Sequence, residues 1–468
     1  MLHKYSMNGI NIAIDGNSGN IHVLDNIAYE LMSQFEEPFT YEQAFEKLHG
    51  RYTSESVKEA WDDINTLVET GGLFAPEIDK DSIIKKAHSN NGIKALCLHV
   101  AHDCNLMCEY CFASKGSYKV AKNLMSVEIA YKAVDFVVKN SGERKNVEID
   151  FFGGEPLLNF DVIKKTVEYG RKVEELTGKK IHFTITTNGV LLDDEKIKYI
   201  NKNMDNVVIS LDGRKETHDA IRYDIARNGT YDKILKAALK LVRERNGKSY
   251  FIRGTFTSRN LDFSKDVFHL ADLGFDEISV EPVVGVGEDF HIRKEHIKDI
   301  LKEYEKLAYE YIERIKSGKP FRFYHFNINL YDGPCLYKRI TSCGAGTEYF
   351  AVTPEGDLYP CHQFVGQPEF KVGDINSGLD NETMQKRFEE ASIFTKDECR
   401  KCWAKLYCSG GCHANSYYSN GDIMKPEETV CKMQRKRIEC AIMIETCKVM
   451  ENEEKDNDFC GSDCNDRS

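Results

Sequence analysis

The sequence predicts an α/β fold: a partial (β/α)6 TIM barrel between a winged-helix-like α+β domain at the N-terminus and a Cys-rich domain at the C-terminus. From Ala95 onward, strand and helix patterns alternate, which is typical of a parallel sheet. Residues 1–85 contain none of the 16 cysteines, which sets this segment apart from the rest of the chain as a separate predicted domain. With 468 residues, the chain is also too long for one ordinary core.

The N-terminal domain, residues 1–85, is predicted to contain three short strands and three helices. The strands are expected at Leu2–Met7, Ile10–Ile14 and Ile21–Leu24, and the helices after Asp25, after Thr40 and at Ser54–Thr70. Asp25 is a suitable N-cap, and Thr40 with Gln43 forms a capping box. The domain serves either in recognition or as a structural appendage. It lacks a Lys/Arg-dense recognition helix, so DNA binding is not expected.

A polar segment, Asp79–Asn91, is predicted to link this domain to the barrel, which spans residues 92–318. Its strands are expected near Ala95–Val100, Val147–Phe152, Ile181–Thr186, Val207–Ile209, Tyr250–Phe256 and Ile278–Glu281. Its helices are expected near residues 126–139, 160–176, 193–203, 230–245, 264–273 and 293–317.

Polar or glycine-rich motifs follow the first four of these strands. They are Cys104–Cys111, Gly153–Pro156, Thr187–Gly189 and Ser210–Gly213. Each alone is a weak signal, because Gly, Asn and Asp also form ordinary loops. Active sites of β/α barrels lie at the C-terminal ends of the strands, so four motifs in register predict an active site there.

Cys104, Cys108 and Cys111 are spaced Cys-x3-Cys-x2-Cys on one short loop. Three thiolates can hold three irons of a [4Fe–4S] cluster and leave the fourth iron open to a ligand that is not protein. Zinc is the competing metal, although structural zinc sites usually pair Cys-x2–4-Cys units and close all four positions.

This spacing resembles that of the radical S-adenosylmethionine (SAM) superfamily, and Tyr110 and Phe112 around the third cysteine fit it. The resemblance implies a partial barrel in which SAM chelates the open iron. One electron then cleaves SAM to methionine and a 5′-deoxyadenosyl radical. A cofactor of this kind carries the difficult chemistry, while the protein positions it and excludes side reactions.

Other residues match SAM-binding positions of the family. By resemblance, Gly153, Gly154 and Glu155 contact the SAM amino group through the backbone and the carboxylate, and Ser210 hydrogen-bonds SAM. Glycine permits a close backbone approach, and a carboxylate accepts hydrogen bonds from a cationic amine.

Two more polar residues have a functional and a structural interpretation. Arg222 resembles an arginine that pairs with the SAM carboxylate, and its alternative is a surface ion pair with Asp219 or Asp224. Asn188 either reaches the SAM ribose or caps a turn. The sequence identifies no catalytic base.

The C-terminal domain, residues 319–450, is Cys-rich and irregular. Its cysteines form the blocks Cys343-x12-Gly356-x4-Cys361 and Cys399-x2-Cys402-x5-Cys408-x3-Cys412, followed by Cys431. This seven-cysteine pattern resembles the SPASM domain, an extension of radical SAM peptide modifiers that carries two auxiliary [4Fe–4S] clusters. Paired zinc ribbons are the alternative.

The resemblance also implies two ligand sets. One cluster is held by Cys399, Cys402, Cys408 and Cys431, and the other by Cys343, Cys361 and Cys412. Cys335 is the one upstream candidate for a fourth ligand to the second cluster. If Cys335 does not bind, one auxiliary iron is open to a substrate thiolate.

Five further cysteines match no cluster motif. Cys97 lies in the first predicted barrel strand and is expected to be a small buried hydrophobe. Cys440 and Cys447 are two helical turns apart and are expected to pack on one face. Cys460 and Cys464 lie in a polar tail, residues 451–468, which is predicted to be disordered.

Composition limits the partners. The formal net charge of −12 argues against nucleic acid, and no apolar run approaches the roughly 20 residues that span a bilayer. The N-terminus lacks a basic region followed by an apolar core, so no signal peptide is expected. The cysteines then favour metal ligands over disulfides and a reducing cytoplasm.

The three parts together resemble maturases of ribosomally made peptides (RiPPs), most closely the thioether-forming maturases of six-cysteine peptides. The resemblance implies three [4Fe–4S] clusters, SAM, a flavodoxin- or ferredoxin-type electron donor and a Cys-rich precursor bound through its leader. Residues 1–85 would then be a RiPP recognition element, which binds the leader by adding it as a strand to the edge of a sheet. The alternatives are a formylglycine-forming anaerobic sulfatase maturase and, from another class, a non-catalytic zinc-binding interaction protein.

Overall fold

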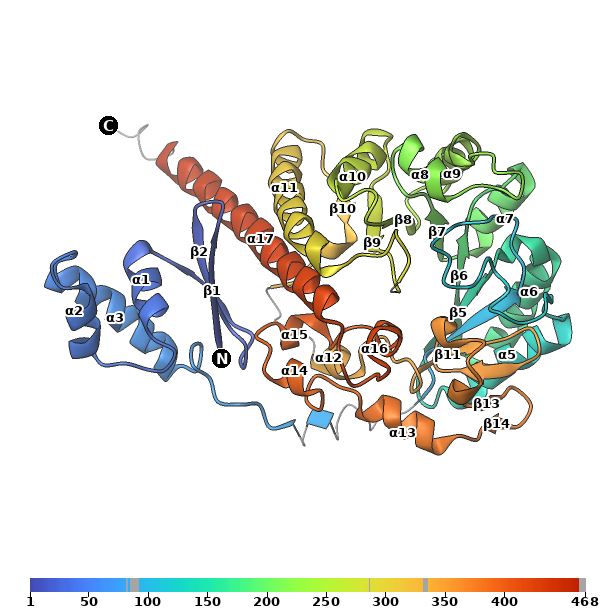
Figure 1. Cartoon of the computed structure of the whole chain (residues 1–468), viewed down its shortest axis with the longest axis horizontal. Coiled ribbons are helices and arrows are strands. Elements are labelled where there is room, and N and C mark those ends of the chain that lie inside the picture. The colour runs from blue at the N-terminus through green and yellow to red at the C-terminus, as the bar shows by residue number, and fades with distance from the viewer. Residues whose placement is uncertain (81–82, 85–91, 286, 331–335, 463–468) are drawn as a thin grey trace.

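The computed structural model describes residues 1–80, 83–84, 92–285, 287–330 and 336–462 (Figure 1). Most of the predicted linker Asp79–Asn91 therefore lies outside the described residues, as do Cys335 and Cys464. Within the described part, the chain forms an N-terminal domain, an open barrel and a C-terminal domain that lies between them (Figure 1).

The N-terminal domain has the predicted elements. An antiparallel sheet in the order β1 (Leu2–Met7), β2 (Ile10–Asp15) and β3 (Ile21–Leu24) precedes α1 (Asn26–Gln34), α2 (Tyr41–Leu48) and α3 (Ser54–Glu69). Asp25 accepts a hydrogen bond from the Ala28 N–H, and the capping box of Thr40 and Gln43 is present. The side-chain caps therefore set where the first two helices begin.

The barrel strands are parallel and follow one another in chain order. They are β4 (Ala95–Ala101), β5 (Asn146–Gly153), β6 (Lys180–Thr187), β7 (Asn206–Ser210), β8 (Tyr250–Phe256) and β9 (Glu277–Pro282). The predicted helices are α5 (Val127–Asn140), α6 (Phe160–Thr177), α7 (Asp194–Asn203), α9 (Tyr231–Glu244), α10 (Phe263–Asp272) and α11 (Ile297–Lys316). A short α8 (Lys215–Ile221) lies between β7 and α9. The predicted partial (β/α)6 barrel is confirmed.

Strands from the C-terminal half extend this sheet, which the sequence did not predict. β10 (Arg322–Phe323) pairs in parallel with β9, and β11 (Tyr349–Val352) pairs in parallel with β4. β12 (Asp357–Tyr359), β13 (Gly373–Asp374) and β14 (Gly378–Leu379) continue beyond β11 in antiparallel fashion. β4 and β10 do not pair with each other, so the barrel is open. The β11 pairing anchors the C-terminal domain at the open side.

The C-terminal domain consists of short helices followed by a long one. They are α12 (Leu336–Thr341), α13 (Glu382–Glu390), α14 (Asp397–Arg400), α15 (Lys405–Cys408), α16 (His413–Asn420) and α17 (Glu428–Ser462). The prediction of a disordered tail from residue 451 is wrong as far as Ser462, because α17 continues through it. The Glu- and Lys-rich composition that suggested disorder is also compatible with a helix.

The N-terminal domain packs on the C-terminal domain through its β1 side (Figure 1). His3 Nε2 lies 2.8 Å from Glu439 Oε1 of α17, and the His3 ring stacks on Trp403 with centroids 4.0 Å apart. Lys405 Nζ donates to Asn17 Oδ1 at 2.9 Å. The β3 edge of the sheet has no strand partner among the described residues.

Three of the cysteines outside the cluster motifs are buried, as expected. Cys97 of β4 is 1% exposed. Cys440 and Cys447 of α17 are buried in the main core, and the Cys440 thiol donates to the Tyr304 carbonyl of α11. These three thiols therefore pack within the fold.

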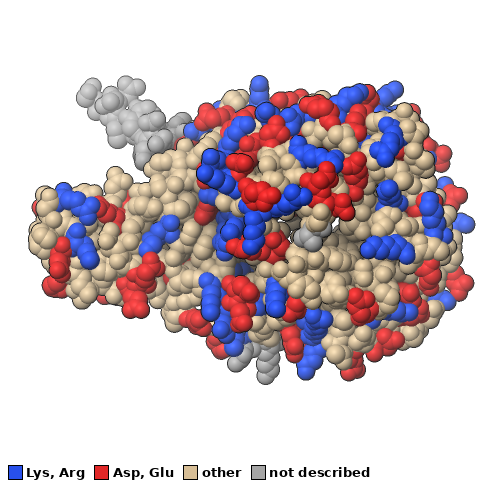
Figure 2. Space-filling model, viewed as in Figure 1, with Lys and Arg blue, Asp and Glu red and all other residues tan. Residues whose placement is uncertain are grey.

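Basic and acidic side chains are interspersed over the face shown in Figure 2. That face presents no single-sign patch of the kind that binds a nucleic-acid backbone. In the part of the chain that the structure describes, no helix is long and apolar enough to cross a membrane.

Candidate active site

One cavity of about 1420 Å³ lies at the C-terminal ends of the barrel strands and extends to the C-terminal domain. Residues from β5, β6, β7, β8 and β9 line one side, and residues from α12, α15, α16 and α17 line the other. The lining includes cysteines from all three predicted cluster sites: Cys104, Cys108, Cys111, Cys343, Cys408, Cys412 and Cys431. Cysteines of the three predicted sites therefore line one shared cavity.

The loop that carries Cys104, Cys108 and Cys111 packs tightly against the end of β5. A Cβ on Gly154 would lie 2.1 Å from the Asp103 carbonyl oxygen, and a Cβ on Gly116 would lie 2.7 Å from Cys104 Cβ. Only glycine fits this approach of two backbones. Burial, together with the neighbouring Glu155 carboxylate, raises the pKa of Cys104 to about 12. A cation at this site would be needed to hold the Cys104 thiol as a thiolate at neutral pH.

Glu155 is fully buried and is not part of the cavity lining. Its carboxylate accepts hydrogen bonds from Thr187 Oγ1 at 2.7 Å, Asn188 N at 2.8 Å and Leu157 N at 3.0 Å. Burial raises its pKa, although the hydrogen bonds oppose that effect. In this structure, Glu155 fixes the end of β6 relative to β5.

Asn188 is positioned by the same network and lines the cavity. Its Nδ2 donates to Asn105 Oδ1 at 2.8 Å, and its Oδ1 accepts from Val190 N at 3.0 Å. The second contact is the turn cap that the sequence analysis considered. The first contact ties Asn188 to the loop of Cys104.

Arg222 is buried, so the expected alternative of a surface ion pair with Asp219 or Asp224 is wrong. Arg222 Nη1 donates to Tyr110 Oη at 2.8 Å and lies 3.9 Å from Asp212 Oδ1. The Tyr110 hydroxyl in turn donates to Asp212 Oδ2 at 2.7 Å. Arg222 Nε is buried without a hydrogen-bond partner. The guanidinium therefore has a free donor beside the cysteine loop.

Ser210 and Phe112 line the cavity as well. Phe112 is 46% exposed, and its ring centroid lies 5.5 Å from that of His362 of the C-terminal domain. Burial and the nearby Arg253 lower the pKa of His362 to about 4, so this imidazole is neutral at physiological pH.

Cysteines of the same predicted set act on one another's pKa values. Besides burial, the thiols of Cys408, Cys431 and Cys402 raise the pKa of Cys399. Besides burial, the thiols that raise the pKa of Cys361 are Cys412 and Cys343. These neighbours are the members of the two ligand sets that the resemblance implies, and the sets themselves stay a prediction. Cys335 lies outside the described residues, so a fourth ligand to the second set has no structural description.

Within the described ranges, no three His, Cys, Asp or Glu side chains are placed to hold one metal ion.

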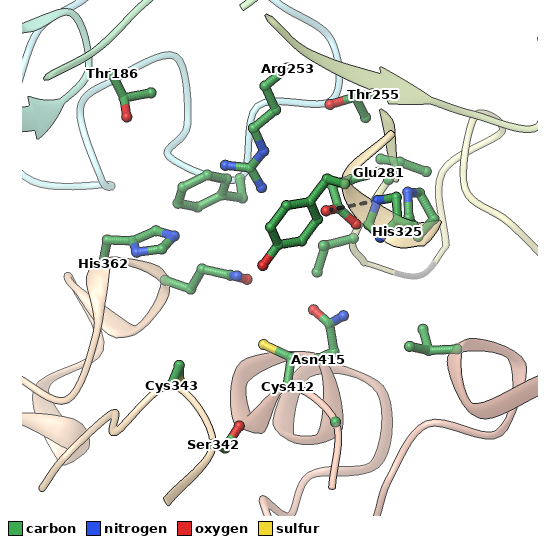
Figure 3. Close-up of a pocket in the computed structure, with 18 of the residues that line it drawn as sticks. Thr186, Arg253, Thr255, Glu281, His325, Ser342, Cys343, His362, Cys412 and Asn415 are labelled. Atoms are coloured by element: carbon green, nitrogen blue, oxygen red, sulfur yellow. Dashed lines mark ion pairs between the residues drawn. The ribbon is translucent and has the colours of Figure 1, made fainter. Parts of the chain in front are cut away.

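Sequence reasoning missed a charged group on the barrel side of the cavity (Figure 3). Glu281 of β9 pairs with His325 at 3.1 Å and with Arg437 of α17 at 3.7 Å. Burial opposes ionisation, but His325, Arg437 and Arg253 hold the pKa of Glu281 well below its usual value. Arg253 comes from β8. Glu281 lies next to the C-terminal end of β9, where active-site residues of β/α barrels gather, so its position in the sixth predicted strand was a usable signal. Arg253 lies in the middle of β8, and no strand-end motif marks it.

This charged group faces the second cysteine set across the cavity. Figure 3 shows Arg253 and Glu281 on one side, with Cys343, Cys412 and Asn415 on the other. A bound molecule between them would meet a charged barrel wall and a thiol-bearing wall.

Two family matches agree with this geometry. Residues 98–257 match the radical SAM superfamily, and residues 343–403 match the SPASM iron–sulfur cluster-binding domain. The chain therefore contains a radical SAM domain and a SPASM domain. This class uses [4Fe–4S] clusters and SAM.

The similar proteins include sulfatase-maturating enzymes, a radical SAM cyclopropyl synthase and a protein solved with a precursor peptide. A cysteine-type anaerobic sulfatase-maturating enzyme of Clostridium novyi (strain NT) is 27% identical over 338 residues, 67% of this chain and 86% of the relative. The radical SAM cyclopropyl synthase TigE of Paramaledivibacter caminithermalis is 25% identical over 376 residues, 75% of this chain and 74% of that protein. Streptococcus suis SuiB bound to its precursor peptide SuiA is 16% identical with a TM-score of 0.51, covering 92% of this chain and 98% of SuiB. The likeness to SuiB concerns the fold alone.

The residues present fit the cofactors of this class. Three thiols lie on one loop at the cavity, glycine backbones leave no room for side chains beside them, and a buried guanidinium has an unused donor there. A cationic donor and polar backbone suit the carboxylate and amino groups of an amino acid such as SAM.

Proposed function

We propose that this protein is a cytoplasmic radical SAM maturase that forms intramolecular Cys thioether crosslinks in a ribosomally made, Cys-rich precursor peptide. The observation that carries the proposal is the single cavity shared by the three cysteine sets. A peptide segment in that cavity would lie between the SAM site and a thiol-bearing auxiliary site. Chemistry that joins a peptide thiol to a peptide carbon needs this arrangement.

We assign the cluster ligands from the spacing of the cysteines in the sequence and from the cysteines that act on one another in the structure. Cys104, Cys108 and Cys111 would hold the SAM-binding cluster. The two auxiliary clusters would be held by Cys399, Cys402, Cys408 and Cys431, and by Cys343, Cys361 and Cys412. When bound, the first cluster and SAM supply a 5′-deoxyadenosyl radical that can remove a hydrogen atom from a peptide carbon.

The protein's own residues would position these groups and shield them. Arg222, held by Tyr110 and Asp212, would offer its free donor to the SAM carboxylate. The backbone of Gly153 and Gly154 would face the SAM amino group, while Glu155 would hold the strand ends rigid from behind. Enclosure by the C-terminal domain would exclude water and competing reactions.

The N-terminal domain, residues 1–85, would bind the leader of the precursor. The β3 edge of its sheet is the one not turned toward α17, and Val23 on β3 is 53% exposed. An extended peptide can add to such an edge through main-chain hydrogen bonds. The presence of this domain supports a substrate that carries a leader. The leader would bind to the N-terminal domain, while the reaction would take place in the cavity.

A second candidate function, sulfatase maturation, is favoured by the similarity to the Clostridium novyi enzyme. That enzyme acts in the maturation of a sulfatase, and the matched region leaves about a third of this chain unmatched. Peptide maturation with a leader gives the N-terminal domain a role that formylglycine formation does not require.

The test uses anaerobically purified, iron-reconstituted protein with SAM, a reductant, and either a Cys-rich precursor or a sulfatase-derived peptide. We expect 5′-deoxyadenosine, loss of two hydrogens from the precursor per event, and a cysteine that no longer reacts with an alkylating reagent. The control is the Cys104→Ala variant, which should form no 5′-deoxyadenosine. Conversion of the sulfatase peptide to formylglycine, with an unchanged precursor, would establish the second candidate instead.

A further inference from the structure

Lys396, which immediately precedes α14, is a fully buried lysine in the C-terminal domain. Its side chain is 1% exposed, and it is among the largest side chains of the protein to be so deeply buried. Burying an ammonium group is costly unless an opposite charge or several hydrogen bonds compensate for it. Lys396 therefore needs a compensating partner inside the protein.

Among the described residues, no carboxylate lies within ion-pairing distance of Lys396, and its Nζ makes one hydrogen bond, to the Gly410 carbonyl oxygen at 3.0 Å. Burial lowers the pKa of Lys396, and the acidic groups that oppose this effect are thiols from both predicted auxiliary sites: Cys399, Cys412, Cys408 and Cys431. At the other buried lysine of this region, Lys405, the carboxylates of Glu77 and Asp15 oppose the same effect together with Cys402.

The hydrogen bond from Lys396 reaches the loop that joins the two auxiliary sites. This loop carries Cys408 of one set and Cys412 of the other, and Ser409, Gly410 and Gly411 between them all have positive φ angles. Such a conformation is unfavourable for a serine unless surrounding contacts hold it. Lys396 is one of these contacts, so it lies at the junction of the two sites.

We propose that Lys396 is a positioning residue whose buried positive charge is shared by the two auxiliary clusters and raises the reduction potential of both. The inference rests on the ligand sets given under the proposed function. A buried cation favours the more negative, reduced form of a nearby centre, and the low-dielectric interior makes this effect strong. Each auxiliary site thereby becomes a better electron acceptor, as expected where the peptide undergoes a net two-electron oxidation.

The test measures the potentials of the auxiliary clusters in the full-length protein. In a Cys104→Ala/Cys108→Ala/Cys111→Ala background, the remaining clusters are titrated with dithionite and followed by EPR. Lys396→Met should reduce the ratio of reduced to oxidised cluster by at least tenfold at a fixed potential, equivalent to about 59 mV for a one-electron couple. The Lys396→Arg variant keeps the charge, so its auxiliary clusters should have reduction potentials close to those of the parent protein.

Lys401→Met is the matched control, because Lys401 is exposed and adjacent to Cys402. It removes the same charge from the same segment where water screens it, so the potentials should not move. If Lys396→Met fails to take up iron, recovery of full iron content in Lys396→Arg supports the same role for the charge. Equal potentials in Lys396→Met and the parent protein, at full iron content, would overturn the inference. A parent protein without auxiliary clusters would instead overturn the ligand assignment.

Discussion

At the scale of single residues, the site depends on buried polar groups that hold one another in place. Tyr110, Asp212 and Arg222 form one such group, and Glu155 with the end of β6 forms another. Neither group can lose a member without leaving a buried donor or acceptor unpaired. Conservative substitutions within either group should therefore have large effects on SAM binding or on the free energy of unfolding.

Arg222→Lys should weaken SAM binding by about tenfold, equivalent to about 1.4 kcal/mol. Lysine cannot reproduce the planar fork with which arginine contacts Tyr110 and offers a second donor. Equilibrium binding of SAM to the reconstituted protein measures the effect. Arg227→Lys, at an exposed position, is the control and should bind SAM as the parent does.

Glu155→Gln should lower the free energy of unfolding of the apoprotein by about 1–3 kcal/mol, because an amide cannot accept all three hydrogen bonds and adds a buried donor. Urea unfolding followed by circular dichroism measures this change. An unchanged unfolding midpoint would mean that the Glu155 network does not stabilise the strand ends.

Arg222 also shows where prediction from sequence stops. Sequence neighbours suggested Asp219 or Asp224 as partners of Arg222. Asp219 instead accepts hydrogen bonds from Thr230 N and Tyr231 N, and Arg222 turns inward to Asp212. Which of several nearby acids an arginine contacts depends on burial, and a local pattern does not encode burial.

At the scale of elements, locally patterned segments were predictable and non-local pairings were not. β4 to β9 were found because each is an apolar run between helical patterns. β11 has only four residues and joins β4 from about 250 positions further along the chain. A helix was expected at Cys440 and Cys447, but the full extent of α17 was not predicted, because its apolar residues do not repeat on one narrow stripe. The helix packs against both α11 and the N-terminal domain.

Val23→Glu on β3 tests the edge assigned to the leader. A charge on an exposed edge strand discourages the addition of another strand, so leader affinity should fall by about tenfold. Fluorescence anisotropy of a labelled leader peptide measures the affinity. Leu176→Glu, at an 85% exposed position on α6, is the control. Equal leader affinity in both variants would place the leader elsewhere.

The contact between the N-terminal domain and α17 should be sensitive to acid, because it includes the pair of His3 on β1 and Glu439 on α17. Burial opposes ionisation, but hydrogen bonds from His3 and Lys436 hold the pKa of Glu439 below its ordinary value of 4.5. This carboxylate therefore contributes stability above the unfolded-state pKa, and that stability is lost as the pH falls below about 4. Thermal unfolding of the apoprotein between pH 3 and pH 7 tests this. The Glu439→Gln variant should show a smaller loss than the parent over that range.

At the scale of the whole molecule, the barrel and the C-terminal domain converge on one cavity, and cysteines from all three predicted cluster sites line it. The fully loaded protein should contain about twelve irons per chain, and alanine substitution of any one ligand set should remove about four. Iron and sulfide analysis with metal quantification measures this. A colourless protein with a few bound zinc ions would instead support a zinc-binding interaction protein.

The most direct measurement follows a hydrogen atom from the peptide to SAM. The enzyme is given a Cys-rich precursor deuterated at its carbon-bound positions, and mass spectrometry records deuterium in 5′-deoxyadenosine alongside the thioether product. If the cavity brings peptide and SAM together as proposed, deuterium appears in 5′-deoxyadenosine in proportion to the peptide that loses two hydrogens. Unlabelled 5′-deoxyadenosine from a fully loaded enzyme, with the peptide intact, would show that this peptide is not its substrate.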